Sequence, residues 1–164
     1  GGFGGVLLHN TGHPSMATIH AASLSQLVDR LITPPINLPP TLLENINIIV
    51  FLMLSKVGGS YVRRVSSILE VVGVEKDRPL TNKILNWNPM GDKFEISGKS
   101  VVLEMLAKKM GLTEAAIKDE LARRKKVLEW MLEKKIYDYK EVATVISTYY
   151  NNPERIMNLI AEGL

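Results

Sequence analysis

Two histidines near the start of the chain are the side chains best suited to chemistry. His13 and His20 flank a short run of small and apolar residues, and Thr18 lies two positions before His20. If residues 16–20 form a strand, alternation places Thr18 and His20 on one face, and ligands usually bind at strand ends of an α/β sheet. An imidazole there can donate to a phosphate oxygen or contact a neighbouring subunit. On spacing alone, the favoured alternative is structural: His13 caps a turn, and His20 is a hydrogen-bonded residue at the strand end.

A second reactive sequence, His9-Asn10-Thr11, follows an apolar run at residues 5–8. The side-chain nitrogen of Asn10 can attack its own carbonyl carbon and cleave the bond to Thr11, while His9 polarises that carbonyl or protonates the leaving amine. Thr11 supplies a hydroxyl nucleophile for ester transfer. This order of residue types resembles the end of an intein followed by the first residue of its host protein. The resemblance implies that residues 1–10 are an intein remnant; the alternative is an unrelated tag or linker.

The residues around both histidines also resemble a known motif. They are similar in order and spacing to the histidine box of type II/IV secretion and pilus-motor ATPases, through Thr11-Gly12-His13, Thr18-Ile19-His20-Ala21 and Asp29-Arg30-Leu31. Residues 24–54, which include Thr33-Pro34-Pro35-Ile36-Asn37-Leu38-Pro39-Pro40, resemble the archaeal branch of that family, the KlbA-like proteins and archaellum motors. The similarity covers roughly residues 11–155.

This resemblance implies a RecA-like ATPase core, assembly into a homo-oligomeric hexamer, and work on a membrane-embedded secretion or pilus platform protein. It implies catalytic roles for His13 and His20, and it places Gly12, Thr18 and Arg30 at the nucleotide or the subunit interface. The parent protein would use ATP and Mg²⁺ and would be cytoplasmic, peripheral at the inner face of the cell membrane. For Arg30, the alternative is a solvated helix residue that pairs with Asp29.

The phosphate-binding loop of such ATPases does not occur in this sequence. There is no Gly-x-x-x-x-Gly-Lys-Ser/Thr, and no lysine follows the glycines at residues 1–5. The acidic Mg²⁺-binding motifs expected before the histidine box are also absent. Backbone amides and a lysine that hold phosphate are indispensable to this chemistry. We therefore expect the chain alone to use no cofactor and to lack ATPase activity.

Charge and composition argue against several other classes of protein. The net charge is only +3, and basic and acidic residues are balanced in both halves, so we expect no nucleic-acid partner. The chain has no cysteine, which excludes disulfides and thiolate metal sites, and we predict no metal site. The longest apolar stretch, Ile46 to Leu54, is too short for a bilayer span, which needs about 20 residues.

Periodicity and turn residues predict the elements that position these groups. They are a strand at 16–20, a helix from Ser23 to about Ile32, a short helix at 40–44, a hairpin of strands 46–56 and 61–75, a second hairpin of 82–88 and 93–97, and helices at 100–110, from Thr113, after Asp138 and at 153–161. Arg63 and Arg64, in the first hairpin, are candidates to face an adjacent subunit, although solvent exposure is the default.

Together these features predict an α/β fold: a partial RecA-like P-loop ATPase core made of C-terminal strands and hairpins, then an α-helical tail. The predicted segments are the intein remnant or linker at 1–10, the C-terminal part of the ATPase domain at 11–98, and a helical subdomain at 99–164. The predicted function is that of a fragment whose parent couples ATP hydrolysis to protein secretion or filament assembly. Two alternatives stay open: a stand-alone assembly or protein-interaction module, and a helical interaction protein with structural histidines.

Overall fold

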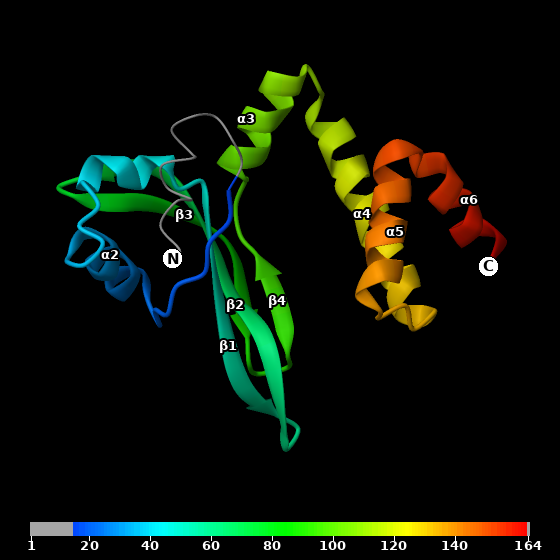
Figure 1. Ribbon diagram of the computed structural model, residues 1–164, viewed down its shortest axis with the longest axis horizontal. Helices are drawn as coiled ribbons and strands as arrows, with labels where there is room; N and C mark the ends of the chain where they lie inside the picture. The colour runs from blue at the N-terminus through cyan, green and yellow to red at the C-terminus, as the bar shows by residue number, and fades with distance from the viewer. Residues whose placement is uncertain (1–14, 164) are drawn as a thin grey trace. The chain divides into compact units, whose positions relative to one another are not determined.

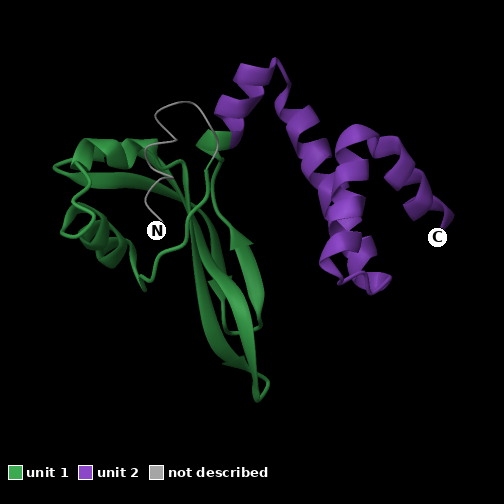
Figure 2. Ribbon diagram, viewed as in Figure 1, with its two compact units in different colours: residues 1–102 green, residues 103–164 purple. Residues whose placement is uncertain are grey.

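The computed structural model describes residues 15–163, which divide into two compact units (Figure 2). The first unit ends at Val102 and contains a β-sheet, whereas the second begins at Leu103 and is helical. Within the described residues, no helix is both long enough and apolar enough to cross a membrane.

From residue 15 to Val102, the first unit has an irregular segment, then two short helices, then four strands (Figure 1). Ser23 caps the first helix, because its side chain accepts a hydrogen bond from the backbone N–H of Gln26. The elements are the α-helix α2 (Leu24–Ile32), the 3-10 helix η1 (Pro40–Asn45), and the strands β1 (Ile48–Val57), β2 (Ser60–Glu75), β3 (Arg78–Asn88) and β4 (Lys93–Ile96).

The four strands form one antiparallel sheet in the order β1-β2-β3-β4. Gly58 and Gly59 form the turn between β1 and β2 with φ of 56° and 87°, a region that favours glycine. Helix α2 and η1 pack against the sheet through an apolar cluster, in which Val28 and Leu43 are almost completely buried. Its buried members are Leu27, Val28, Leu31, Leu43, Ile49 and Leu69.

The described part of the second unit is helical, and three of its helices begin at a polar capping residue. Thr113, Asp138 and Asn152 each accept a hydrogen bond from a backbone N–H at the start of a helix. The helices are α3 (Val101–Met110), which begins at the end of the first unit, α4 (Glu114–Glu133), α5 (Tyr139–Asn151) and α6 (Pro153–Glu162). The core of this unit is formed by Val127, Met131, Tyr149 and Ile156.

The sequence predicted both hairpins and all of these helices, and the mixed α/β class is confirmed. The strand predicted at residues 16–20 is wrong, because these residues have no regular secondary structure. A strand must share its backbone hydrogen bonds with a neighbour, and residues 16–20 join no ladder in the described part of the chain. The three strand pairs among the described residues are all antiparallel. The parallel strands of a RecA-like core are not among them, so that core stays a prediction.

Candidate functional site

Three of the residues that the sequence grouped as a nucleotide site lie in the described part of the chain, namely Thr18, His20 and Arg30. Thr18 and His20 are both exposed and lie in an irregular segment, so the premise that they share one face of a strand is wrong. Arg30 is exposed on α2. Its expected partner, Asp29, instead forms an ion pair with Arg78 of β3, with Nη2 and Oδ1 2.8 Å apart. The other predicted site residues lie outside the described residues: His9, Asn10, Thr11, Gly12 and His13.

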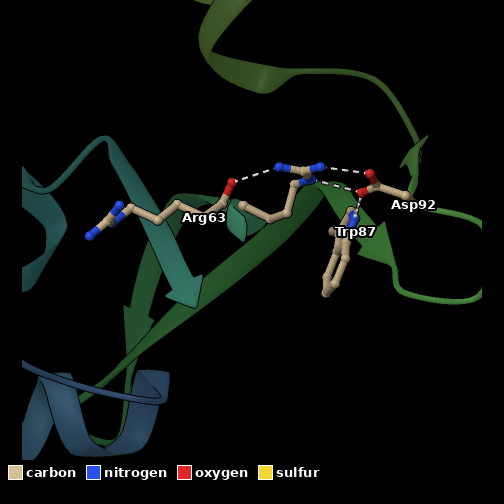
Figure 3. Close-up of polar contacts among 4 residues, drawn as sticks. Arg63, Trp87 and Asp92 are labelled. Carbon is tan, nitrogen blue, oxygen red and sulfur yellow. Dashed lines mark hydrogen bonds and ion pairs between the residues drawn. The ribbon is translucent and has the colours of Figure 1, made fainter. Parts of the chain in front are cut away.

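A compact polar cluster joins β2 to the turn between β3 and β4 (Figure 3). Arg64 donates from Nε to Oδ1 of Asp92 at 2.7 Å and from Nη2 to Oδ2 at 2.6 Å. Trp87 donates from its indole nitrogen to Oδ1 of the same carboxylate at 2.8 Å. Two parallel N–H···O bonds between a guanidinium and a carboxylate fix the position and the orientation of both groups. The cluster therefore holds the turn between β3 and β4 against β2.

Local turn chemistry explains how Asp92 reaches this position. The backbone of Asp92 is left-handed, with φ of 51°, a conformation that aspartate tolerates better than most residues. The preceding Gly91 has φ of 122°, and the side chain of Asn88 accepts a hydrogen bond from the N–H of Met90 at 2.9 Å. These features turn the chain sharply after β3, and the carboxylate of Asp92 then meets Arg64 and Trp87.

The electrostatics of this cluster favour a permanent ion pair. The hydrogen bond from Arg64, followed by that from Trp87, lowers the pKa of Asp92 to about 2. The same hydrogen bond with Asp92 raises the pKa of Arg64. Because neither group titrates near neutral pH, the pair is unsuited to general acid or base catalysis. Its role is to position the strand and the turn.

Arg63 differs from Arg64 although the two are adjacent. Its guanidinium points away from Asp92 (Figure 3), and the side chain is exposed. Nη1 of Arg64 donates to the backbone carbonyl of Arg63 at 3.0 Å, which holds the backbone at this position. Of the two arginines, Arg63 is therefore the one available to an anionic group of a ligand or a partner.

A buried carboxylate forms a second polar cluster, at the end of the first unit. Glu70 of β2 is fully buried and accepts hydrogen bonds from the backbone N–H of Val101 at 2.8 Å and of Val102 at 3.3 Å. It also accepts from the side chains of Asn82, at 3.1 Å, and Ser100. The first N–H groups of a helix lack partners within the helix. Glu70 therefore caps α3 from the sheet.

Two opposing effects act on the pKa of Glu70. Burial raises it, because a carboxylate loses solvation in the interior. The hydrogen bonds from Ser100, Val101, Asn82 and Val102 together outweigh that effect, and the net pKa is lowered. Glu70 is therefore ionised at neutral pH and complements the positive end of the helix dipole.

The two arginines of the basic run at residues 123–126 on α4 pair with acidic groups of their own unit. Arg123 pairs with Glu154 at 2.5 Å, and Arg124 pairs with Glu120 at 2.7 Å. Glu120 also accepts a hydrogen bond from the hydroxyl of Tyr149 at 3.0 Å. These contacts connect α4 with α5 and α6, so the two arginines contribute to the fold of the helical unit.

Sequence reasoning missed the roles of Glu70, Trp87 and Asp92. The asparagine, proline and glycine at residues 88–92 predict a turn. Arg64, which Asp92 of this turn contacts, lies on a strand 28 positions earlier, and no local pattern indicates that contact. Glu70 carried no local signal, because its partners follow it by 12 to 32 positions. Among the described residues, no group of three histidine or acidic side chains could hold a metal ion.

Comparison with known proteins relates the C-terminal region to a family. Residues 91–162, which begin just before Asp92 and include the helical unit, match the family model described as "PilB3-like, C-terminal". This match shows a C-terminal region related to PilB-type secretion ATPases.

The chain is also similar to longer proteins of Methanocaldococcus jannaschii. Uncharacterized protein MJ0900 is 35% identical over 146 residues, which are 85% of this chain and 26% of that protein. Uncharacterized protein MJ1287 is 35% identical over 142 residues, which are 80% of this chain and 53% of that protein. Uncharacterized protein MJ0781 is 28% identical over 145 residues, which are 87% of this chain and 20% of that protein. The chain thus spans about half, or less, of the relatives that it matches.

Proposed function

We propose that this chain is the C-terminal part of an archaeal motor ATPase of the KlbA-like secretion and pilus-assembly type. The observation that carries the proposal is the match of residues 91–162 to the PilB3-like C-terminal family. The greater length of the relatives supports a parent protein with room for the phosphate-binding loop that this sequence lacks. In that parent, ATP hydrolysis with Mg²⁺ drives protein secretion or filament assembly.

The parent in this proposal is a RecA-like hexamer at the inner face of the cell membrane, where it works on a membrane-embedded platform protein. This chain contributes His13 and His20 to catalysis and Gly12, Thr18 and Arg30 to the nucleotide or subunit interface. The exposure of Thr18, His20 and Arg30 supports this assignment, because exposed polar side chains are free to meet groups supplied by the rest of the parent.

Turnover assays on the parent and on this chain test the proposal. We expect no Mg²⁺-dependent ATP hydrolysis by the chain alone and turnover of order 1 s⁻¹ or faster by the parent. In the parent, His20→Ala should lower kcat without changing the melting temperature, whereas Met16→Ala, in the same exposed segment, should change neither. Early melting of His20→Ala with normal activity per folded molecule would instead assign His20 a structural role. A parent that never hydrolyses ATP would favour an assembly or interaction module.

We also propose that residues 1–10 are the end of an intein that splices at the Asn10–Thr11 bond. The support is the order His9-Asn10-Thr11 at the point where the resemblance to secretion ATPases begins. In the full precursor, Asn10→Ala should block cleavage at this bond, which mass spectrometry of the products would show. Unimpaired splicing in that variant would make residues 1–10 a linker.

A further inference from the structure

Helix α4 has a second apolar stripe, beside the face that it buries in its own unit. Leu121, Leu128 and Leu132 are 45% to 65% exposed, whereas Val127 and Met131 are buried in the core of the helical unit. At 3.6 residues per turn, the three leucines lie within about 40° of one another and about 100° from the two buried residues. Helix α4 therefore has one apolar face inside its unit and another that is exposed.

Helix α5 carries a stripe with the same spacing. Tyr139, Ile146 and Tyr150 follow one another by seven and four positions, as the three leucines of α4 do. They are 42% to 74% exposed, whereas Tyr149 lies in the core. Residues at these spacings lie on one side of an α-helix, so α5 also has an exposed apolar face.

Two contacts place these stripes beside each other in antiparallel order. The guanidinium of Arg124, one turn after Leu121, lies 5.5 Å from the centroid of the Tyr150 ring. At the other end, the hydroxyl of Tyr137, just before α5, donates to the backbone carbonyl of Leu132 at 3.5 Å. The two stripes together form one surface, the α4/α5 face, which consists of Leu121, Leu128, Leu132, Tyr139, Ile146 and Tyr150.

The spacing along α4 is that of a helix that packs against another helix. Leu121, Lys125, Leu128 and Leu132 follow one another by four, three and four positions. The seam of a coiled coil has this spacing, and in it the side chains of one helix insert between those of the next. The backbone groups inside a helix are bonded within the helix, so an extended segment cannot pair with them. An amphipathic helix is therefore the occupant that fits this face.

The seam is basic as well as apolar. Lys125 lies between two of its leucines, and Lys118 lies seven positions before Lys125. The side chains of these lysines are 74% and 71% exposed. Their carboxylate partners, Glu129 and Glu114, lie on α4 itself four positions away, and exposed ion pairs of this kind are weak. Acidic residues of an incoming helix can therefore pair with both lysines.

A second copy of the chain fits this seam poorly. Parallel pairing of two α4 helices sets Lys118 and Lys125 against the same lysines of the other copy. Antiparallel pairing that sets Leu121 against Leu132 also sets Lys118 against Lys135. Like charges that face each other across an interface disfavour the complex. The charges thus favour an acidic helix over a second α4.

We propose that the α4/α5 face binds an amphipathic helix of a separate partner protein, which carries acidic residues opposite Lys118 and Lys125. The apolar side chains of that helix cover the leucines of α4 and pack on the tyrosine rings of α5. The helical unit already closes its own core, and a family model is confined to residues 91–162. Both observations favour another protein over a further segment of the parent as the source of the helix. The inference does not depend on the nucleotide site or on ATP hydrolysis by the parent.

Two synthetic helical peptides test the inference. Both span about three heptads with leucine in the seam. The first has glutamate in the seam at every seventh residue, to match the spacing of Lys118 and Lys125, and the second has lysine there. In fluorescence anisotropy, the chain should bind the acidic peptide at least about 10 times more tightly than the basic one. The double variant Lys118→Glu/Lys125→Glu should reverse this preference. Equal affinities of the two peptides, or no binding of the acidic one, would overturn the inference.

Matched substitutions show whether the peptide binds at this face. Leu128→Glu should weaken binding of the acidic peptide by at least about 10-fold, because it places a charge in the apolar seam. Leu54→Glu, at a similarly exposed leucine of β1, should leave the affinity unchanged. Both variants should keep the melting temperature of the native chain, since neither side chain is buried. Unchanged affinity of Leu128→Glu would contradict the inference.

Two further measurements distinguish other occupants. Leu128→Glu should leave the sedimentation coefficient of the chain unchanged; a dimer that this variant dissociates would assign the face to a second copy. The acidic peptide should bind the parent as tightly as it binds the chain. Loss of binding in the parent would show that a segment of the parent covers the face. Either of these contrary results would overturn the inference.

Discussion

At the residue scale, the ion pair of Arg64 with Asp92 should make the stability of the first unit depend on pH. The pKa of Asp92 in the fold is about 2, below its ordinary value of 3.8. A carboxyl with a lowered folded-state pKa stabilises the fold above pH 3.8, and this contribution is lost as the pH falls toward 2. We expect the urea midpoint of the native chain to fall over this range and that of Asp92→Asn to fall less. Asp77→Asn, in an exposed turn, should behave like the native chain; equal pH profiles for all three would contradict the prediction.

Glu70 gives a second prediction at this scale. Glu70→Gln keeps the size of the side chain but removes the charge and places an amide donor among groups that all donate. Loss of a hydrogen bond to a charged group costs about 1–3 kcal/mol, so we expect the free energy of unfolding in urea to fall by about that amount. The matched change Glu75→Gln, at an exposed position on the same strand, should have little effect. A Glu70→Gln variant as stable as the native chain would show that capping of α3 does not depend on the charge.

At the element scale, Asp138 starts α5 and offers a test of capping. Its Oδ1 accepts hydrogen bonds from the N–H groups of Lys140 at 2.9 Å and Glu141 at 3.4 Å. Removing such a cap costs about 0.5–2 kcal/mol, so Asp138→Ala should lower the free energy of unfolding by this amount in thermal or urea denaturation. Asp138→Asn should retain most of the stability, because asparagine caps helices as well as aspartate. If both variants lose the same stability, the charge rather than the hydrogen bond is what matters.

At the scale of the whole molecule, the helical unit has a core of its own. Val127, Met131, Tyr149 and Ile156 pack together from α4, α5 and α6. We therefore expect residues 99–164, expressed alone, to keep their helical circular dichroism and to unfold cooperatively. Ile156→Ala should destabilise this piece by about 2–5 kcal/mol, the usual cost of a large cavity. A gradual loss of ellipticity without a transition would show that the helices depend on the rest of the protein.

The sequence by itself determined those elements whose signals are local. Ser23, Thr113 and Asp138 marked helix starts, and Gly58-Gly59 marked a hairpin, because caps and turns act on backbone groups within a few residues. The tertiary structure alone decided which distant side chains meet. Arg64 and Asp92 are 28 positions apart, and Glu70 lies 31 positions before Val101. Residues 16–20 look like a strand by composition but have no partner strand in the described chain. Pairing and burial depend on neighbours that fold topology supplies, and no local pattern encodes them.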